Sequence, residues 1–181
     1  MSTMINLSEL TGDYVIDAAR TRIGFVARHT MSTRVRGQFE VFEGGAHLDG
    51  DHPSRSGARL TVLASSIQTR NRQRDDMLSG KFLDTDNHPA IIFDATGVAP
   101  VDKSNFKVTG DLAVRGVSQQ VTLDVELTDG GRGAQGDFRV GFKGSATINR
   151  NDWGVNWNAA TALMVSPKVT LEFDVTVIRQ P

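Results

Sequence analysis

The sequence predicts an all-β protein built as an eight-stranded antiparallel β-barrel with a short helical insertion. Apolar and polar residues alternate with a period of two in about eight segments, which is typical of strands with one wet face. Such a sheet would expose two long edges unless it closed on itself, and a closed barrel of eight strands can hold one small ligand. The segment 69–88 departs from this alternation and predicts the insertion.

The alternation is clearest in the second half of the chain. There Phe106, Val108 and Leu112 share one face of a strand, while Lys107 and Asp111 lie on the other. The expected strands are 23–29, 35–41, 58–65, 91–97, 106–114, 117–127, 138–148 and 169–177. The pair Arg115-Gly116 predicts a tight hairpin, and the polar residues 129–136 predict a longer loop.

Residues 69–88 are expected to be helical because polar and apolar residues mix there on a helical spacing, and Pro89 would end the helix. A helical excursion between two strands is placed to cap or gate a barrel mouth. Its charged run, residues 70–76, is interpreted as a solvated helix face, with a part in gating or in contact with a ligand head group as the alternative.

Composition and charge indicate one soluble domain. It is expected over residues 13–179, with an N-terminal tail over residues 1–12. The formal net charge of −1 comes from 20 basic and 21 acidic residues, so a nucleic acid partner is not expected. The chain has no cysteine, no apolar run long enough to span a membrane and no recognisable signal peptide, which predicts a cytoplasmic protein without disulfides.

No motif indicates a catalytic residue, a metal site or a cofactor. Residues 131–136 fit the pattern G-x-G-x-x-G, but they lead into a strand, whereas dinucleotide binding needs a helix at that point. Asp84, Asp86 and His88 could approach a cation, although capping and turn bonding explain them better. No Ser or Thr has a convincing His partner, so the protein is not expected to be an enzyme.

Three polar or amphipathic positions leave alternatives open. His29 continues the inward face of Ile23, Phe25 and Ala27, either as a satisfied core histidine or as a contact to a ligand head group. Trp153 and Trp157 fall where the alternation stops. They are interpreted as a packing plug at the barrel end or as the wall of a lipid portal, since indole combines a large apolar body with one hydrogen-bond donor.

Several segments, in order and with similar spacing, resemble the YceI-like family of lipocalin-like proteins associated with polyisoprenoid binding. They are 25–29, 35–39, 66–71, 74–78, 82–84, 88–93, 110–117 and 148–154, within a match from about Tyr14 to Ile178. The resemblance implies an extended eight-stranded lipocalin-like barrel that encloses a tunnel for an isoprenoid quinone precursor or a related amphiphile. It also implies that homodimers are common, that no catalytic activity is established, and that many relatives are periplasmic.

The resulting hypothesis is a protein that binds a long apolar lipid in the barrel for carriage, storage or sequestration. The residues expected to contact this lipid are Ile23, Phe25, Ala27, His29, Val35, Phe39, Phe93, Leu112, Val114, Phe142, Arg150, Trp153 and Phe173. An isoprenoid lipid is the expected partner, and a homodimer is a possible assembly. The alternatives are an enzyme that acts on a small hydrophobic substrate with His29 as its base, and a structural domain whose barrel is filled by side chains.

Overall fold

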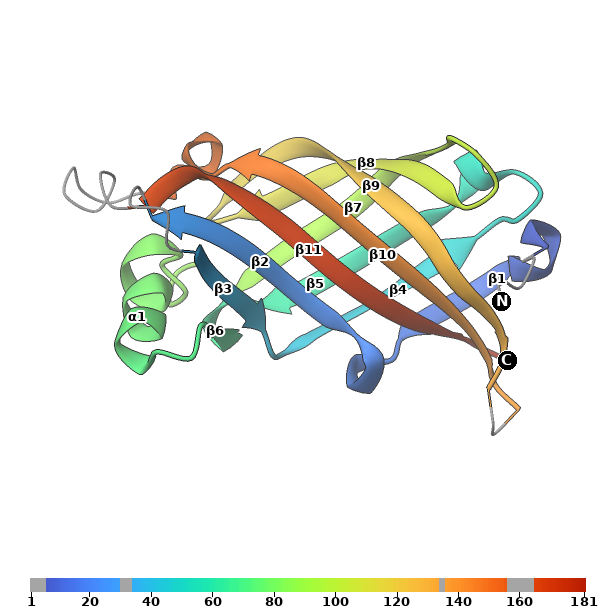
Figure 1. Cartoon of the computed structure of the whole chain (residues 1–181), viewed down its shortest axis with the longest axis horizontal. Helices are drawn as coiled ribbons and strands as arrows, with labels where there is room; N and C mark the ends of the chain where they lie inside the picture. Colours follow the sequence, from blue (N-terminus) through green and yellow to red (C-terminus); the bar gives the residue numbers. More distant parts are fainter. Residues whose placement is uncertain (1–5, 30–33, 134–135, 156–164) are drawn as a thin grey trace.

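The chain forms one elongated β-barrel (Figure 1). A computed structural model describes residues 6–29, 34–133, 136–155 and 165–181. Within these residues eleven strands form a single sheet in which every pair is antiparallel. The strands are β1 (Gly12–Ile16), β2 (Arg22–His29), β3 (Arg34–Phe39), β4 (Phe42–Leu48), β5 (Gly57–Leu63), β6 (Ile67–Gln68), β7 (Ala90–Pro100), β8 (Asn105–Val114), β9 (Val117–Arg132), β10 (Phe138–Asn149) and β11 (Val165–Arg179).

The sheet closes because β1 pairs with β4 on one side and with β11 on the other. The eleven strands occupy eight positions around the barrel. β1 and β2 both pair with β11 and share one position, β3 and β4 share the next, and β5 and β6 share the third. β7 to β11 fill the remaining positions as long hairpin-linked strands. The prediction of an eight-stranded antiparallel barrel is therefore confirmed.

Three positions are broken by short irregular segments that the alternation did not reveal. The breaks are η2 (Ala18–Arg20), the pair Glu40–Val41, and η4 (Ala64–Ser66). The second break corrects the expected strand 35–41, because β3 ends at Phe39 and the chain turns before β4. Val41, which was expected to share the face of Phe39, is 54% exposed to solvent.

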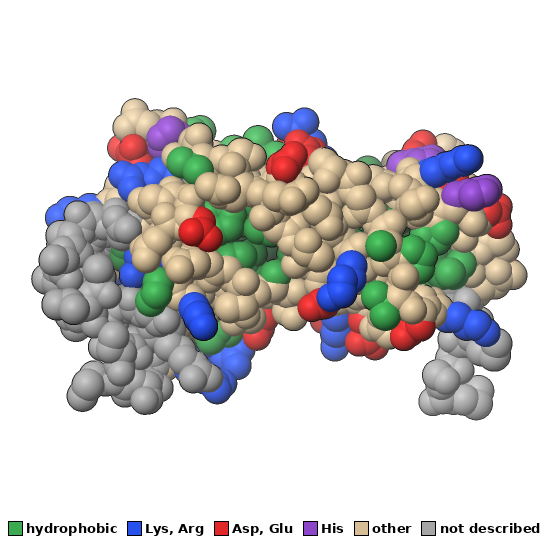
Figure 2. All heavy atoms as spheres, turned by 90° about the horizontal axis from the view of Figure 1, so that it is seen from above, with side chains coloured by type: hydrophobic (Ala, Val, Ile, Leu, Met, Phe, Trp, Pro, Cys, Tyr) green, Lys and Arg blue, Asp and Glu red, His purple; other side chains and the backbone are tan. Residues whose placement is uncertain are grey.

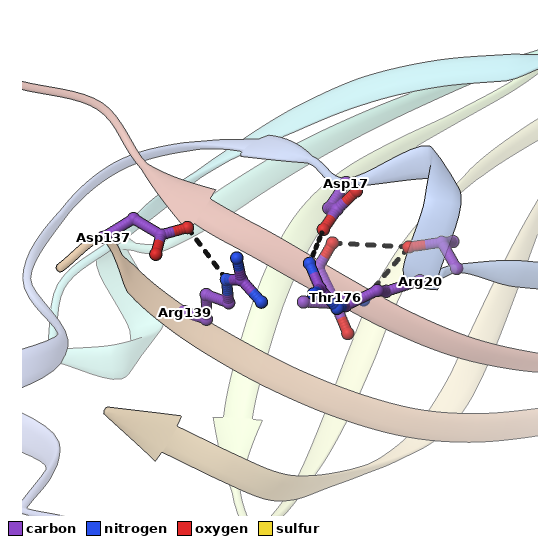
Figure 3. A network of polar contacts seen from close by, with 6 residues as sticks. Asp17, Arg20, Asp137, Arg139 and Thr176 are labelled. Carbon is purple, nitrogen blue, oxygen red and sulfur yellow. Dashed lines mark hydrogen bonds and ion pairs between the residues drawn. The ribbon is translucent and has the colours of Figure 1, made fainter. Parts of the chain in front are cut away.

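The break at η2 lies on the seam where β11 changes partner from β2 to β1 (Figure 3). The Asp17 N–H donates to the Thr176 carbonyl at 2.8 Å, and the Thr176 N–H donates to the Thr21 hydroxyl at 3.1 Å. Arg20 pairs with Asp17 at 2.9 Å. Hydrogen bonds of this kind satisfy backbone groups where the ladder is interrupted, and they keep the barrel closed.

The helical insertion is shorter than expected. It consists of α1 (Arg72–Met77) and a π-helical turn, η5 (Leu78–Phe82), whereas residues 69–88 were expected to be helical. Asn71 caps α1 by accepting the Arg74 N–H at 3.0 Å. The helix ends before Pro89 because Asp84 adopts a left-handed conformation with φ of 47°. In Figure 1 the insertion lies at the end of the barrel next to β3 and β6.

The expected N-terminal tail over residues 1–12 also needs correction. Residues 1–5 lie outside the described part, but η1 (Leu7–Leu10) belongs to the fold. Leu10 is 5% exposed, and its carbonyl accepts the Tyr14 hydroxyl at 2.7 Å. The Leu7 carbonyl lies where a side chain on Gly50 would sit, so this close approach requires glycine. A short 3-10 helix carries no strand alternation, so the sequence pattern does not indicate it.

The turn predictions were right for one hairpin and only partly right for another. Arg115 and Gly116 both have positive φ, 52° and 76°, and they join β8 to β9 in a two-residue turn as expected. The longer loop expected over residues 129–136 is smaller, because β9 continues to Arg132. A bulge opposite Gly141 and Phe142 lets this end of β9 stay paired with β10.

Candidate functional site: an apolar lumen

One cavity of about 420 Å³ runs inside the barrel, and its wall draws on all eight positions. We call this cavity the lumen. It reaches from Leu7 and Leu10 at one end to Phe82 and Trp153 at the other. Its volume falls in the range of about 300–1,000 Å³ that is usual for small-molecule sites. Figure 2 shows charged side chains of both signs scattered over one face, with hydrophobic side chains in hollows between them.

The middle of the barrel is hollow, whereas both of its ends are packed. Phe25, Phe93, Phe142 and Phe173 line the lumen, yet each keeps part of its surface accessible. Well-packed protein interiors leave few voids larger than a water molecule, so partial exposure of inward residues marks an open space. At one end Leu10, Tyr14 and Val140 belong to a tightly buried cluster, and at the other Ile67, Phe82 and Leu83 belong to a second one.

Most of the residues predicted to contact a lipid lie on this wall. Those that line the lumen are Ile23, Phe25, Ala27, Phe39, Phe93, Leu112, Val114, Phe142, Arg150, Trp153 and Phe173. Val35 is buried at 8% exposure but is not part of the wall. The backbone of His29 ends β2, and its side chain lies outside the described residues, so its two alternatives stay predictions. Contact of the wall residues with a ligand also stays a prediction.

The wall contains further residues that the predicted set left out. Val121, Leu123 and Val125 of β9 alternate in the same way as their neighbours and could have been included. Leu78, Phe82 and Leu83 come from the insertion, and Leu7 and Leu10 come from η1. These last two groups had no usable sequence signal, because neither segment follows the period of a strand.

Arg150 is the charged residue buried at the end of the lumen. It begins η6 (Arg150–Trp153), is 6% exposed, and lies with its guanidinium 5.5 Å from the centre of the Phe82 ring. Its Nη1 donates to the Val155 carbonyl at 2.7 Å. Burial lowers the pKa of Arg150, but a guanidinium stays protonated in proteins, so a positive charge is held beside an apolar cavity.

Trp153 closes the same end of the barrel and also forms part of the wall. It is 3% exposed, and its indole N–H donates to the Leu112 carbonyl at 2.8 Å. The ring packs with Leu112, Val121 and Leu123. Both interpretations of Trp153, as packing plug and as wall, therefore describe part of what the structure shows. Trp157 lies outside the described residues.

Other charged residues that border the lumen are used elsewhere. Arg59 pairs with Asp94 at 3.6 Å, and Glu172 pairs with Arg36 at 3.5 Å. All four side chains are more than a third exposed. Asp49 accepts the His52 N–H at 2.8 Å in the turn between β4 and β5. The lumen wall is therefore almost entirely apolar, apart from the end near Arg150.

The insertion is held to the barrel by a compact polar network around Thr69. Thr69 is 4% exposed, and its hydroxyl and N–H both donate to Asp75, the N–H at 2.8 Å. Arg74 donates to the Thr69 hydroxyl at 2.8 Å and to its carbonyl at 2.7 Å. Arg74 was expected on a solvated face of the helix, but it folds back onto the chain before α1. The network anchors the segment that supplies Leu78, Phe82 and Leu83 to the wall.

The histidines in the described part of the chain, whose side chains can be placed, lie on the outside. His47 lies 2.8 Å from Asp13 across β4 and β1, and His88 lies 4.0 Å from Asp84. Within the described ranges no group of three His, Cys, Asp or Glu residues is arranged to hold a metal ion. The same part of the chain holds no helix that is long and apolar enough to cross a bilayer.

The fold and the site define a closed antiparallel β-barrel around an elongated apolar lumen. Residues 14–177 match the model of the YceI-like domain, and the chain belongs to this family. It is 32% identical over 174 residues to a UPF0312 protein of Pseudomonas paraeruginosa, which covers 94% of this chain and 89% of that protein. A UPF0312 protein of Staphylococcus aureus is 33% identical over 150 residues, covering 82% and 85% of the two chains.

Solved structures show the same fold at lower sequence identity. BcnA of Burkholderia cenocepacia superposes with a TM-score of 0.81 at 21% identity, covering 89% of this chain and 98% of BcnA. A polyisoprenoid-binding domain from Saccharophagus degradans superposes with a TM-score of 0.70 at 17% identity, covering 92% and 98% of the two chains. The YceI protein of Campylobacter jejuni gives a TM-score of 0.73 at 24% identity, covering 82% and 87%.

Proposed function

We propose that this protein binds one long apolar lipid, of the polyisoprenoid or isoprenoid-quinone type, in its lumen and carries, stores or sequesters it. The observation that carries the proposal is the continuous apolar wall around the 420 Å³ cavity. Burial of apolar surface supplies affinity in such sites, at roughly 25 cal/mol per Å², and a few polar groups supply orientation. The likeness in fold to a polyisoprenoid-binding domain supports the same ligand class.

The length of the lumen suits a chain of several isoprene units. Val169 and Val177 both line it and are eight residues apart on β11. At about 3.3 Å per residue and a strand tilt of about 40°, this span measures roughly 20 Å along the barrel axis. One extended isoprene unit, with four chain bonds of about 1.5 Å, spans about 5 Å. The lumen therefore accommodates about four extended units.

The wall supports binding better than chemistry. General acid–base catalysis needs titratable groups that converge on one reacting atom. The charged group buried at this wall is Arg150, which does not exchange its proton near neutral pH. We propose that Arg150 orients the polar head of the ligand, while the remaining wall holds its chain.

Native mass spectrometry of freshly purified protein tests the proposal, followed by extraction and identification of any bound lipid. The protein is expected to carry one prenyl lipid per chain. The variant Leu171→Trp should lose it, because Leu171 lines the lumen and a larger side chain would fill that space. Thr170→Trp is the matched control, since Thr170 contacts Thr147 on the other face of the sheet and should keep the lipid.

The proposal would be wrong if the wild-type chain carried no lipid and also failed to take up prenyl alcohols added after delipidation. It would also be wrong if Leu171→Trp retained as much lipid as Thr170→Trp, because the lipid would then lie outside the lumen.

A further inference from the structure

Three phenylalanine rings of the lumen wall occupy the space above glycines on neighbouring strands. Phe25 lies over Gly37, Phe93 over Gly110, and Phe173 over Gly144. In each case a Cβ atom built on the glycine would meet ring atoms closer than 3.0 Å, a distance that real Cβ atoms essentially never show. Gly37 is the direct cross-strand partner of Phe25, and Gly144 is that of Phe173. We call these three pairs the glycine seats.

The seat at Gly37 is the simplest of the three. The nearest atoms to its built Cβ all belong to the Phe25 ring, namely Cζ, Cε1 and Cε2. At Gly110 and Gly144 a backbone carbonyl, of Asp94 and Asp124 respectively, also lies within 3.0 Å. Gly37 has an ordinary extended backbone, so a side chain there requires only that the Phe25 ring shift.

The position of these rings bears on how much of the barrel is hollow. An eight-stranded barrel is only just wide enough inside for side chains to fill it or for one small ligand to enter. An aromatic ring that packs flat on a glycine of the next strand lies along the wall, a known stabilising arrangement in sheets. The same ring standing away from the wall would occupy the centre of the lumen. The three phenylalanines of the glycine seats are half-buried and lie in the hollow middle of the barrel.

We propose that Gly37, Gly110 and Gly144 set the inner width of the lumen, which we call its bore, and thereby determine which lipid chains can enter. The glycines act indirectly, because each leaves room for a phenylalanine ring to lie against the wall. The effect on ligands rests on the proposed function, whereas the effect on the rings does not. A side chain at a seat pushes its ring into the lumen and converts a hollow barrel into a filled one.

Gly37→Ala tests the inference most directly. The structure of this variant is determined without any ligand, so the position of the Phe25 ring does not depend on the proposed function. A crystal structure of the variant is expected to show the Phe25 ring turned into the lumen and away from Gly37. The affinity for geranylgeraniol, a prenyl alcohol of four isoprene units, should fall at least tenfold. Gly97→Ala is the matched control, because Gly97 lies in β7 of the same sheet and its built Cβ meets nothing within 4 Å.

The double variant Gly37→Ala/Phe25→Leu shows whether Gly37→Ala loses binding because the lumen is narrowed or because the fold is destabilised. Leucine lacks the Cζ, Cε1 and Cε2 atoms that overlap the new methyl group, so the double variant should regain most of the geranylgeraniol affinity that Gly37→Ala loses. Phe25→Leu alone should bind more weakly than wild type, since it removes an apolar contact of the wall, but more tightly than Gly37→Ala. If Gly37→Ala does not fold, recovery of both folding and binding in the double variant supports the same conclusion.

Two outcomes would overturn the inference. One is a Gly37→Ala structure in which the Phe25 ring stays against β3 while the strands move apart. The other is a double variant that binds geranylgeraniol no better than Gly37→Ala, because overlap with the Phe25 ring would then not be the cause of the loss. Failure of the wild type to bind any prenyl alcohol would refute the proposed function, and the ring positions would still decide the role of the seats.

Discussion

At the scale of single residues, the face of the strand decides what a side chain does. Phe39 lines the lumen with its ring centre 5.8 Å from that of Phe25, whereas Val41, two residues later, is exposed to solvent. The same apolar character therefore lines the lumen at one position and faces solvent at the other. The difference arises from the break at Glu40–Val41, which turns the chain between β3 and β4.

This difference makes Phe39→Asp and Val41→Asp a matched pair. Phe39→Asp places a carboxylate against an apolar lumen without a partner, and burial of such a charge is unfavourable by several kcal/mol. We expect it to abolish retention of co-purified lipid, measured by native mass spectrometry. Val41→Asp should retain lipid normally. Equal retention in both variants would contradict the placement of Phe39 on the wall of the ligand site.

Tyr14 provides a second test at this scale. Its hydroxyl donates to the Leu10 carbonyl and fixes η1 against the end of the barrel, and burial raises the pKa of this phenol. Tyr14→Phe should lower the free energy of unfolding by about 1 kcal/mol, the usual net value of one hydrogen bond. Urea denaturation measures it. A variant as stable as wild type would show that this hydrogen bond does not help to hold η1 in place.

Individual polar contacts were the least predictable feature at the residue scale. The alternation of β2, β7 and β11 correctly placed Phe25, Phe93 and Phe173 on the inside. No local sequence pattern predicts that Arg74 folds back onto Thr69, or that Arg150 lies over the Phe82 ring. These contacts depend on segments that meet only after the barrel has closed, and the sequence around each residue does not contain that information.

At the scale of elements, the insertion closes a gap that the strands leave open. β5 pairs with β7. Within the described residues, β6, which continues the position of β5, pairs only with β3. The insertion lies between β6 and β7 in the sequence, and its Phe82 and Leu83 pack against Ile67 of β6. Movement of this one segment would open the lumen without breaking any pairing between long strands.

Limited proteolysis tests this role of the insertion. Arg70 and Arg72 are exposed, whereas Arg74 is bonded to Thr69. Trypsin should cut after Arg70 and Arg72 in delipidated protein, and bound prenyl lipid should slow this cleavage several-fold, because opening would then also cost the lipid contacts of Leu78 and Phe82. Cleavage at the tip of the β7–β8 hairpin, after Lys103, is the internal control. Identical rates at Arg70 with and without lipid would argue against a gate.

Element boundaries were harder to predict than the elements themselves. Alternation reports which face a residue occupies, and it continues in sequence even where the backbone bends. The long strands β8 to β11 were therefore located well, while the breaks at η2 and η4 were missed. β1 and β4 were missed as well, because β4 contains Gly44 and Gly45 in place of alternating large residues.

At the scale of the whole molecule, acidic carboxylates set the response of stability to pH. Hydrogen bonds lower the pKa of three carboxyls: those of Asp49 from the His52 N–H, of Asp102 from the Ser104 N–H, and of Asp137 from the Arg139 side chain. Because these folded-state pKa values lie below the unfolded value of about 3.9, the carboxyls stabilise the fold above that pH, and the contribution is lost as the pH falls further. Their contribution to the melting temperature should therefore stay constant from about pH 5 to 8 and decline below about pH 4. Asp137→Asn should decline less steeply. A variant that follows the wild-type acid profile would show that Asp137 contributes nothing.

The dependence of affinity on chain length reflects the dimensions of the whole lumen. Each isoprene unit buries about five carbons, a gross gain of about 4 kcal/mol that chain ordering reduces to about 1–2 kcal/mol. Affinity for prenyl alcohols should therefore rise about tenfold per unit and stop rising at about four units, where the estimated 20 Å length is filled. Salt should have little effect, since the wall is almost entirely apolar. Titration monitored by tryptophan fluorescence, with Trp153 and Trp157 as reporters, measures this series. A steep dependence of affinity on salt, or no dependence on chain length, would mean that the head group and not the lumen dominates binding.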